Sequence, residues 1–368
     1  MEFSSSSAHT LGVEIEFQIL DNKDLNLVPF APLLLDQAPK LLRPRLSLEF
    51  IKSILEIQTG VCDDLRDVEN DLLQTCALAE ELAVDNQFLL YAASLHPFAL
   101  AADQELSDNE RYEKIMQELQ IIGRRFISQG LHVHIGMPDG ETAIKVCNLI
   151  QAFLPIFLTL SSSSPFYQGK DTGLMSYRTK LFEALPLAGL FEYMQNWQHF
   201  VDQIDSLTKY GVIQGFRDLW WDARPNPELG TIEVRVCDLP VKFTSILALA
   251  ALIQSSAAWL VEAVQPASSL NPYLLKANKW QAARHGLEGR FVDPTNILGD
   301  HPMQFRLAAM ILKRRVSPYA AKLGCESYLE NLDAIISGGT GADQMRRIYQ
   351  NTRDFHQVVR EIQKEFWQ

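Results

Sequence analysis

The chain has few cysteines and no closely spaced pair of them. Its cysteines are widely separated, at Cys62, Cys76, Cys147, Cys237 and Cys325. This spacing lacks the C-x-x-C pairs that are typical of zinc knots and redox motifs. The cysteine count is odd, and the first ten residues are polar and rich in serine, so we expect no secretory signal. Reduced thiols and a cytoplasmic location are the resulting expectations.

Basic residues are also scarce relative to acidic ones. The chain has 33 Lys and Arg against 45 Asp and Glu, which gives a formal net charge of −12. This balance argues against a nucleic-acid backbone or an anionic membrane as partner. It does not argue against ATP, because a nucleotide meets protein carboxylates through Mg²⁺.

Long uninterrupted hydrophobic runs and phosphate-loop motifs are missing as well. The most apolar stretch, 243–264, contains several polar residues and Glu262, which favours a core helix over a membrane span. The run Gly338-Gly339-Thr340-Gly341 lacks the Gly-Lys-Ser/Thr ending of a phosphate loop and a preceding strand. We therefore interpret it as a turn between two helices.

The hydrophobic pattern predicts one large α+β domain. Of the 368 residues, 47% are hydrophobic and 21% are charged, which is ordinary for a globular protein. We expect a disordered tail over 1–9 and a single catalytic domain over 10–368, rich in strands up to about residue 240 and helical after it. Strands are predicted over 11–20, 88–94, 129–136 and 230–236. This order favours a largely antiparallel sheet flanked by helices over regular βαβ alternation.

Helices and loops follow from the same pattern. Residues 46–55 are apolar at helical spacing, 165–189 read as a long irregular loop, and 220–227 are rich in turn-forming residues. A loop of that length inside a compact domain is usually functional. Helices are predicted over 63–87, 109–122, 140–160, 243–264, 273–285, 303–315, 325–337 and 343–366.

The most informative segment is Leu11–Phe17, which reads LGVEIEF. Its apolar residues alternate with Glu14 and Glu16, and a period of two places both carboxylates on one face of a strand. Such carboxylates lie about 7 Å apart and repel each other unless a positive charge sits between them. An exposed sheet face or a bound divalent cation would each explain the pair.

Three further segments place acidic or imidazole groups on one face. Glu49 and Glu56 are seven residues apart, which is about two turns of a helix, although the geometry is open if the chain becomes a strand before Glu56. His132 shares a strand face with His134, and Glu233 with Arg235. Each pair alone is explained by a solvated surface or a cross-strand ion pair.

Together these faces could line one side of a single curved sheet. Carboxylates with a rare imidazole suit Mg²⁺ or Mn²⁺ better than a structural zinc ion. Two or three such ions could hold a triphosphate. Arg178 in the long loop and Arg224 in the segment WWDARP would complement them, since arginine binds phosphate or carboxylate through two hydrogen bonds.

At these residues the sequence resembles the carboxylate–amine ligases of the glutamate–cysteine ligase type 2 family, from about Thr10 to the C-terminus. The resemblance rests on five blocks and a weaker sixth: Leu11–Phe17, Glu56–Cys62, Leu131–Gly136, Ser164–Arg178, Trp221–Asp238 and His285–Asp293. It implies a glutamine-synthetase-like fold related to guanidino kinases, in which a curved antiparallel sheet forms an open funnel. It also implies that ATP activates a γ-carboxylate, such as that of glutamate, as an acyl phosphate. An amine such as cysteine then captures this acyl phosphate to form an amide, with release of ADP and phosphate.

The resemblance also implies roles for single residues. Glu14 and Glu16 would face different Mg²⁺ or Mn²⁺ ions, with Glu56 and Glu49 completing one shell and His132 and Glu233 the other. The remaining roles concern catalysis and recognition: Arg235 and Arg178 as catalytic residues, Tyr177, Arg178, Arg224 and Arg284 for substrate or ATP binding, and His134 as a support behind the ligands.

Several alternatives stay open at this point. The same metal–ATP site would serve guanidino-kinase or glutamine-synthetase-like chemistry, and a non-catalytic nucleotide-binding protein would keep the fold. A zinc hydrolase built on His132 and His134 is a fourth reading. The sequence names neither the acid nor the amine, and it is compatible with a homodimer.

Overall fold

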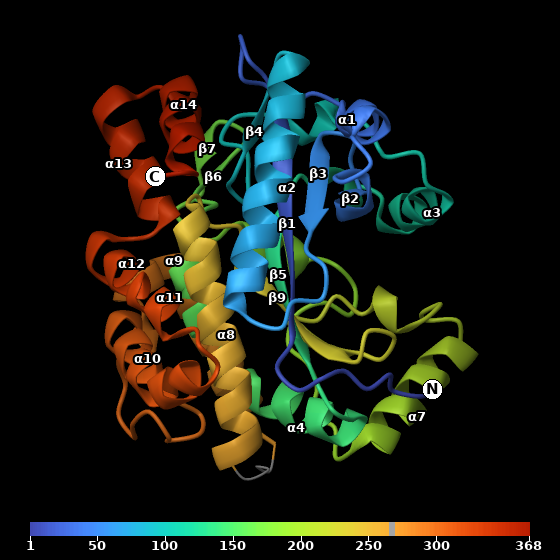
Figure 1. Cartoon of the computed structure of the whole chain (residues 1–368), viewed down its shortest axis with the longest axis vertical. Helices are drawn as coiled ribbons and strands as arrows, with labels where there is room; N and C mark the ends of the chain where they lie inside the picture. Colours follow the sequence, from blue (N-terminus) through green and yellow to red (C-terminus); the bar gives the residue numbers. More distant parts are fainter. Residues whose placement is uncertain (265–268) are drawn as a thin grey trace.

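The computed structural model describes residues 1–264 and 269–368 (Figure 1). Its centre is a seven-stranded sheet in which all strand pairs are antiparallel, with the order β2-β3-β1-β5-β9-β8 and with β4 paired to β1. The strands are β1 (Leu11–Asp21), β2 (Leu46–Leu48), β3 (Ile54–Gln58), β4 (Phe88–Tyr91), β5 (Gly130–Gly136), β8 (Ala223–Asn226) and β9 (Thr231–Asp238). Two small hairpins lie outside this sheet: β6 (Phe166–Tyr167) with β7 (Lys170–Asp171), and β10 (Arg290–Phe291) with β11 (Met303–Gln304). The predicted open antiparallel sheet is confirmed.

Helices cover one face of the sheet, and further helices lie on either side of it (Figure 1). The longer ones are α2 (Leu65–Asp85), α3 (Glu110–Leu119), α4 (Gly140–Ile150), α7 (Trp197–Lys209), α8 (Phe243–Ala263), α9 (Pro272–His285), α10 (Phe305–Lys322), α13 (Gly341–Thr352) and α14 (Phe355–Glu365). The shorter ones are α1 (Ala31–Gln37), α5 (Leu154–Ser161), α6 (Arg178–Phe182), α11 (Glu326–Glu330) and α12 (Leu332–Gly338). Figure 1 shows α2 and α8 lying across the sheet, with α10 to α14 gathered beside α8.

The alternating pattern of β1 determines which face of the sheet is covered. Val13, Ile15 and Phe17 are buried in the main hydrophobic core. Because successive side chains point to opposite faces, Glu14 and Glu16 project from the other face. Of the most apolar window of α8, 83% is buried inside the protein, in agreement with the predicted core helix.

Two helix predictions in the first half of the chain need correction. Residues 46–55 form β2, a turn and the start of β3, because the pairing of β2 with β3 and of β3 with β1 satisfies the backbone groups of this apolar segment. Glu49 therefore lies in the turn, outside any strand or helix. The predicted helix over 140–160 is divided into α4 and α5, whose axes differ by 67°, and Pro155 stands in the first turn of α5.

The loop predictions and the C-terminal helices also differ in detail. Residues 220–227 contain β8, and 165–189 contain the β6–β7 hairpin and α6. The predicted helix over 343–366 is two helices separated at Arg353, whose φ of 54° is incompatible with a continuing helix, and 325–337 likewise contains α11 and α12. The segment Gly338–Gly341 is the predicted interhelical turn, closed by a capping box in which Thr340 and Asp343 pair.

The segment before β1 has a defined path, whereas the sequence predicts a disordered tail there. The Ser4 N–H donates to the Pro227 carbonyl at 2.8 Å, and the Ser6 N–H donates to the Met137 carbonyl at 3.0 Å. The Phe3 ring meets Trp197 of α7 edge to face. The segment thus crosses the ends of β5 and β9 on its way into β1.

Candidate active site

The register of the central strands brings the predicted acidic and imidazole residues into one row. Glu16 of β1 stands opposite Glu56 of β3, and Glu14 stands opposite His132 of β5. Farther along the row, Glu233 of β9 stands between His134 of β5 and Arg224 of β8. Glu49 reaches the row from the turn between β2 and β3, where it lines the same cavity as Glu16 and Glu56.

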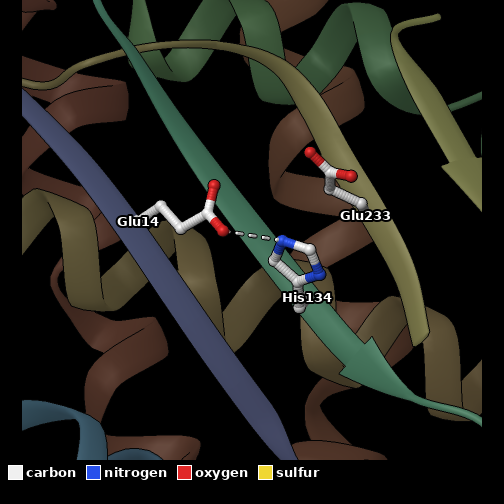
Figure 2. Close-up of side chains that lie close together, drawn as sticks. All are labelled: Glu14, His134 and Glu233. Carbon is white, nitrogen blue, oxygen red and sulfur yellow. Dashed lines mark ion pairs between the residues drawn. The ribbon is translucent and has the colours of Figure 1, made fainter. Parts of the chain in front are cut away.

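One group of three possible metal ligands spans β1, β5 and β9. Figure 2 shows the Glu14, His134 and Glu233 side chains directed toward one another from these three strands. One ligand atom from each lies within 4.8 Å of the others, and His134 Nε2 is 3.2 Å from Glu14 Oε1. The other ring nitrogen, Nδ1, is 3.0 Å from Thr231 Oγ1, which orients the imidazole.

Two further groups continue the row toward β3. Glu14, Glu56 and His132 form one, and Glu16, Glu49 and Glu56 form the other, each with ligand atoms within 4.8 Å of one another. Glu14 and Glu56 therefore each belong to two groups. The arrangement differs in one respect from the resemblance, since Glu233 is grouped with His134 and not with His132. The register pairs Glu233 directly with His134, and the pairing of β5 with β9 shifts by one residue between Leu131 and Val133, next to His132.

The carboxyl groups of Glu16, Glu49 and Glu56 lie close together, and the positive charge near them does not offset their mutual repulsion. Burial and the charge of Glu49 raise the pKa of Glu16 from 4.5 to about 8. Burial also raises the pKa of Glu49, and burial with the charges of Glu49, Glu14 and Glu16 raises that of Glu56 well above its ordinary value. A divalent cation among them would remove this repulsion, so the donor set fits Mg²⁺ or Mn²⁺.

The two histidines have opposite electrostatic environments. Burial and the nearby Arg235 lower the pKa of His132 to about 4, which favours its neutral form, and its Nε2 has no hydrogen-bond partner among the described residues. A neutral imidazole with a free nitrogen is the form that ligates metals. Burial acts against a charge on His134 too, but the carboxylates of Glu14 and Glu233 outweigh it and raise its pKa.

Three arginines lie next to the row of candidate ligands, and we call Arg178, Arg224 and Arg235 the arginine platform. Arg224 Nε donates to Glu233 Oε2 at 3.0 Å, and Arg235 pairs with the other oxygen of the same carboxylate. Although burial opposes ionisation, these two cations hold the pKa of Glu233 far below its usual range. Arg178 lies beneath them and donates to the backbone carbonyl of Arg235 at 3.3 Å.

A glycine that the sequence does not single out makes room for Arg178. A Cβ atom on Gly130 would lie only 2.4 Å from Arg178 Nη2. The Gly130 N–H also donates to Glu16 Oε2 at 2.7 Å. Gly130 therefore lies between a candidate metal ligand and the arginine platform, where no larger residue fits without displacing one of them.

The row of candidate ligands and two of these arginines line a cavity of about 240 Å³. Its acidic wall holds Glu14, Glu16, Glu49, Glu56 and His132, and Arg224 and Arg235 line it as well. The opposite wall is apolar and includes Phe50, Tyr112, Ile115, Leu119, Phe126 and Phe182. No sequence signal marks this apolar wall, because it comes from segments that only the folded chain brings together.

Two predicted binding residues lie elsewhere. Tyr177 packs on Tyr167 with ring centroids 5.0 Å apart, and Arg284 is exposed on α9, where it donates to the Gly173 carbonyl. Neither residue lines the cavity described above.

Comparison with known proteins identifies the family of the chain. The family described as "Glutamate-cysteine ligase family 2 (GCS2)" matches residues 10–364. The chain belongs to this family. It is therefore an enzyme of the ligase type that forms amide bonds. A Gloeobacter violaceus protein named "Putative glutamate--cysteine ligase 2" is 39% identical over 98% of both chains, and a protein of the same name from Herpetosiphon aurantiacus is 33% identical over 97% of this chain and 92% of its own.

Solved structures show the same fold at low sequence identity. The glutamate–cysteine ligase of Francisella tularensis, solved in complex with AMP, has a TM-score of 0.71 at 14% identity and matches 100% of this chain and 90% of its own. A bifunctional glutathione synthetase from Pasteurella multocida has a TM-score of 0.72 at 14% identity and matches 98% of this chain and 52% of its own. The predicted glutamine-synthetase-like fold is confirmed.

Proposed function

We propose that the protein is an ATP-dependent carboxylate–amine ligase that activates the γ-carboxylate of glutamate and joins it to an amine such as cysteine. The observation that carries this proposal is the row of three overlapping ligand groups beside the arginine platform. Family membership supports the reaction class, and the names of the relatives support the two substrates. The AMP bound to the Francisella ligase supports an adenine nucleotide.

The ligand groups suit two or three Mg²⁺ or Mn²⁺ ions. Carboxylate oxygens are the preferred ligands of these ions, and His132 and His134 supply the rarer imidazoles. When bound, the ions supply positive charge that neutralises the triphosphate of ATP. The chain's own residues would fix the spacing of these charges, because the candidate ligands other than Glu49 project from paired strands of one rigid sheet.

The reaction then has two balanced steps. An oxygen of the γ-carboxylate attacks the γ-phosphorus of ATP, the bond to the leaving ADP breaks, and an acyl phosphate forms. The amine nitrogen attacks the acyl carbon, the C–O bond to phosphate breaks, and the nitrogen loses a proton as the amide forms. Phosphorylation matters because it replaces oxide, a very poor leaving group, with phosphate.

The arginine platform would act on the transferring phosphoryl group. Arg235 and Arg224 line the cavity and are held by the Glu233 carboxylate, so their guanidinium groups are oriented before substrate binds. Preoriented cations stabilise the charge on the equatorial oxygens of a phosphoryl group in transfer. Arg178 supports this arrangement by donating a hydrogen bond to the backbone carbonyl of Arg235.

The alternative functions have less support. In a mononuclear zinc hydrolase His132 and His134 would bind one ion, but the two imidazoles belong to different ligand groups, each with two carboxylates. A non-catalytic nucleotide-binding protein would not need the complete set of carboxylates. Kinase chemistry shares the metal–ATP half of the site, and the reaction product decides between a kinase and a ligase.

A cytoplasmic location and a homodimer remain predictions.

The test is a product assay on the purified protein. It is incubated with MgATP, glutamate and a panel of amines, and mass spectrometry follows new amides while a colorimetric assay follows phosphate. We expect one amide and one phosphate per ATP, and no turnover after metal removal by EDTA. A stable phosphorylated acceptor would identify a kinase.

The same assay on variants tests the metal site. Glu14→Gln and Glu16→Gln should abolish turnover, while Glu81→Gln, at an exposed position of α2, serves as the matched control. Unchanged turnover in both site variants would refute the metal assignment.

A further inference from the structure

A buried ionic cluster lies behind the arginine platform, outside the candidate active site. At its centre is Lys279 of α9, whose side chain is only 6% exposed. The ammonium nitrogen lies 2.6 Å and 2.8 Å from the two oxygens of Asp222 and 3.2 Å from Glu183 Oε1. These contacts occupy all three donors of the lysine.

Through Asp222, the cluster is connected to Arg235 and Arg224. Asp222 stands immediately before β8, and its backbone carbonyl accepts the N–H groups of Arg235 at 2.8 Å and Val236 at 3.1 Å. Arg224 follows two residues later in the chain. The position of Asp222 thus determines where β8 meets β9, at the point where both arginines reach Glu233.

Through Glu183, the cluster is connected to Arg178. Glu183 is the residue directly after α6, and its N–H donates to the Thr179 carbonyl at 3.0 Å. Arg178 is the first residue of the same short helix. Lys279 therefore connects the two segments that carry the platform, although α9 itself contributes no residue to the catalytic cavity among the residues described.

We propose that Lys279 is a positioning residue, which holds Asp222 and Glu183 at a fixed separation and thereby sets the spacing of the three platform arginines. The proposal rests on the proposed function for its kinetic consequence. A buried ion pair contributes little net stability compared with apolar packing. A lysine at this buried position is therefore better explained by the geometry that it imposes than by the folding energy that it adds.

The kinetic test is the variant Lys279→Met. Since the arginines act on the phosphoryl group during transfer, we expect kcat and kcat/KM for MgATP to fall together, by about 10- to 100-fold. Lys279→Arg should restore most of the rate. A second cavity, of about 720 Å³, borders Lys279 and Glu183 and leaves room for the larger guanidinium group. Lys276→Met, an exposed position on the same helix, is the control and should keep the wild-type rate.

A double variant separates positioning from misfolding. Lys279→Met alone leaves the Asp222 carboxylate buried without its partner, which can unfold the chain. Lys279→Met with Asp222→Asn removes both charges of this pair, and Glu183 keeps its ion pair with Lys180 at 2.6 Å, so the double variant should fold while remaining slow. A double variant with the wild-type rate would overturn the proposal, since the lysine would then serve only to neutralise Asp222.

A crystal structure of the Lys279→Met variant gives a readout that does not depend on activity. We expect Arg178 or Arg224 to move by about 1 Å or more relative to Glu233, a displacement large enough to slow catalysis strongly. In Lys279→Arg both should keep their places. Unmoved arginines in Lys279→Met would overturn the proposal. If the wild-type protein forms no amide with any amine, the proposed function fails, and this structural comparison still decides the role of Lys279.

Discussion

Without bound metal, the buried Glu16 carboxyl group should make the protein less stable as the pH rises. Its pKa in the folded chain is raised from 4.5 to about 8 by burial and by the charge of Glu49. Between these two values the folded state binds the proton that the unfolded state has released. The contribution of Glu16 to stability is therefore complete below about pH 4.5 and is lost as the pH rises to about 8.

The magnitude follows from the linkage between pKa and stability. Each pH unit inside this window costs about 1.4 kcal/mol for one group, so the loss between pH 6 and pH 8 is on the order of 2 kcal/mol. In Glu16→Gln the side chain keeps its shape and can still accept the Gly130 N–H, but it has no proton to lose. This share of the loss should therefore be absent from the variant.

The assay is urea unfolding in EDTA at pH 6, 7 and 8. The wild-type free energy of unfolding should fall more steeply with pH than that of Glu16→Gln, and Glu81→Gln should follow the wild type. Because the histidines are present in every chain, their titration largely cancels in the comparison. Added Mg²⁺ should reduce the wild-type loss, since the cation stabilises the ionised carboxylate. Equal slopes for the wild type and Glu16→Gln would refute the reasoning.

Three further predictions concern the same site. Glu14→Gln and Glu233→Gln should each lower turnover at least about 100-fold, because each removes a candidate ligand, and steady-state phosphate release measures this; near-normal rates would contradict the ligand groups. Gly130→Ala should lower turnover about 10-fold or more by pushing Arg178 aside, whereas Gly215→Ala, where a Cβ meets nothing within 4 Å, should be neutral in the same assay. Mg²⁺ added at pH 7 in weak buffer should release protons, because carboxyl groups with raised pKa values ionise when they bind metal; a pH-stat that records no release would contradict the raised values.

Local pattern was enough to predict the parts of the site that lie on regular strands. The alternation in β1 correctly separates the buried face from Glu14 and Glu16, and the same rule places His132 and His134 together. The position of Glu49 could not be predicted in this way. The apolar spacing of 46–55 is typical of a helix, whereas pairing of β2 with β3 and of β3 with β1 makes the segment part of the sheet. The competing tertiary contact outweighs the local preference there.

Other features depend on contacts between segments that are distant in the sequence. The register between β5 and β9 places Glu233 opposite His134, and no local signal reports the register of two strands a hundred residues apart. The steric role of Gly130 depends on Arg178, which approaches from α6, the short helix within residues 165–189. Lys279 and Asp222, its main partner, are 57 residues apart in the chain.

The ends of the central sheet bear on how copies of the chain could associate. Its outer strands β2 and β8 have only three and four residues, and β8 contains Pro225, which has no N–H to donate. Short edges interrupted by proline discourage a second molecule from extending the sheet by hydrogen bonding. If this ligase forms a dimer, its subunits should therefore meet through helices or loops. Dimer formation would then leave the strands of each active-site cavity unchanged.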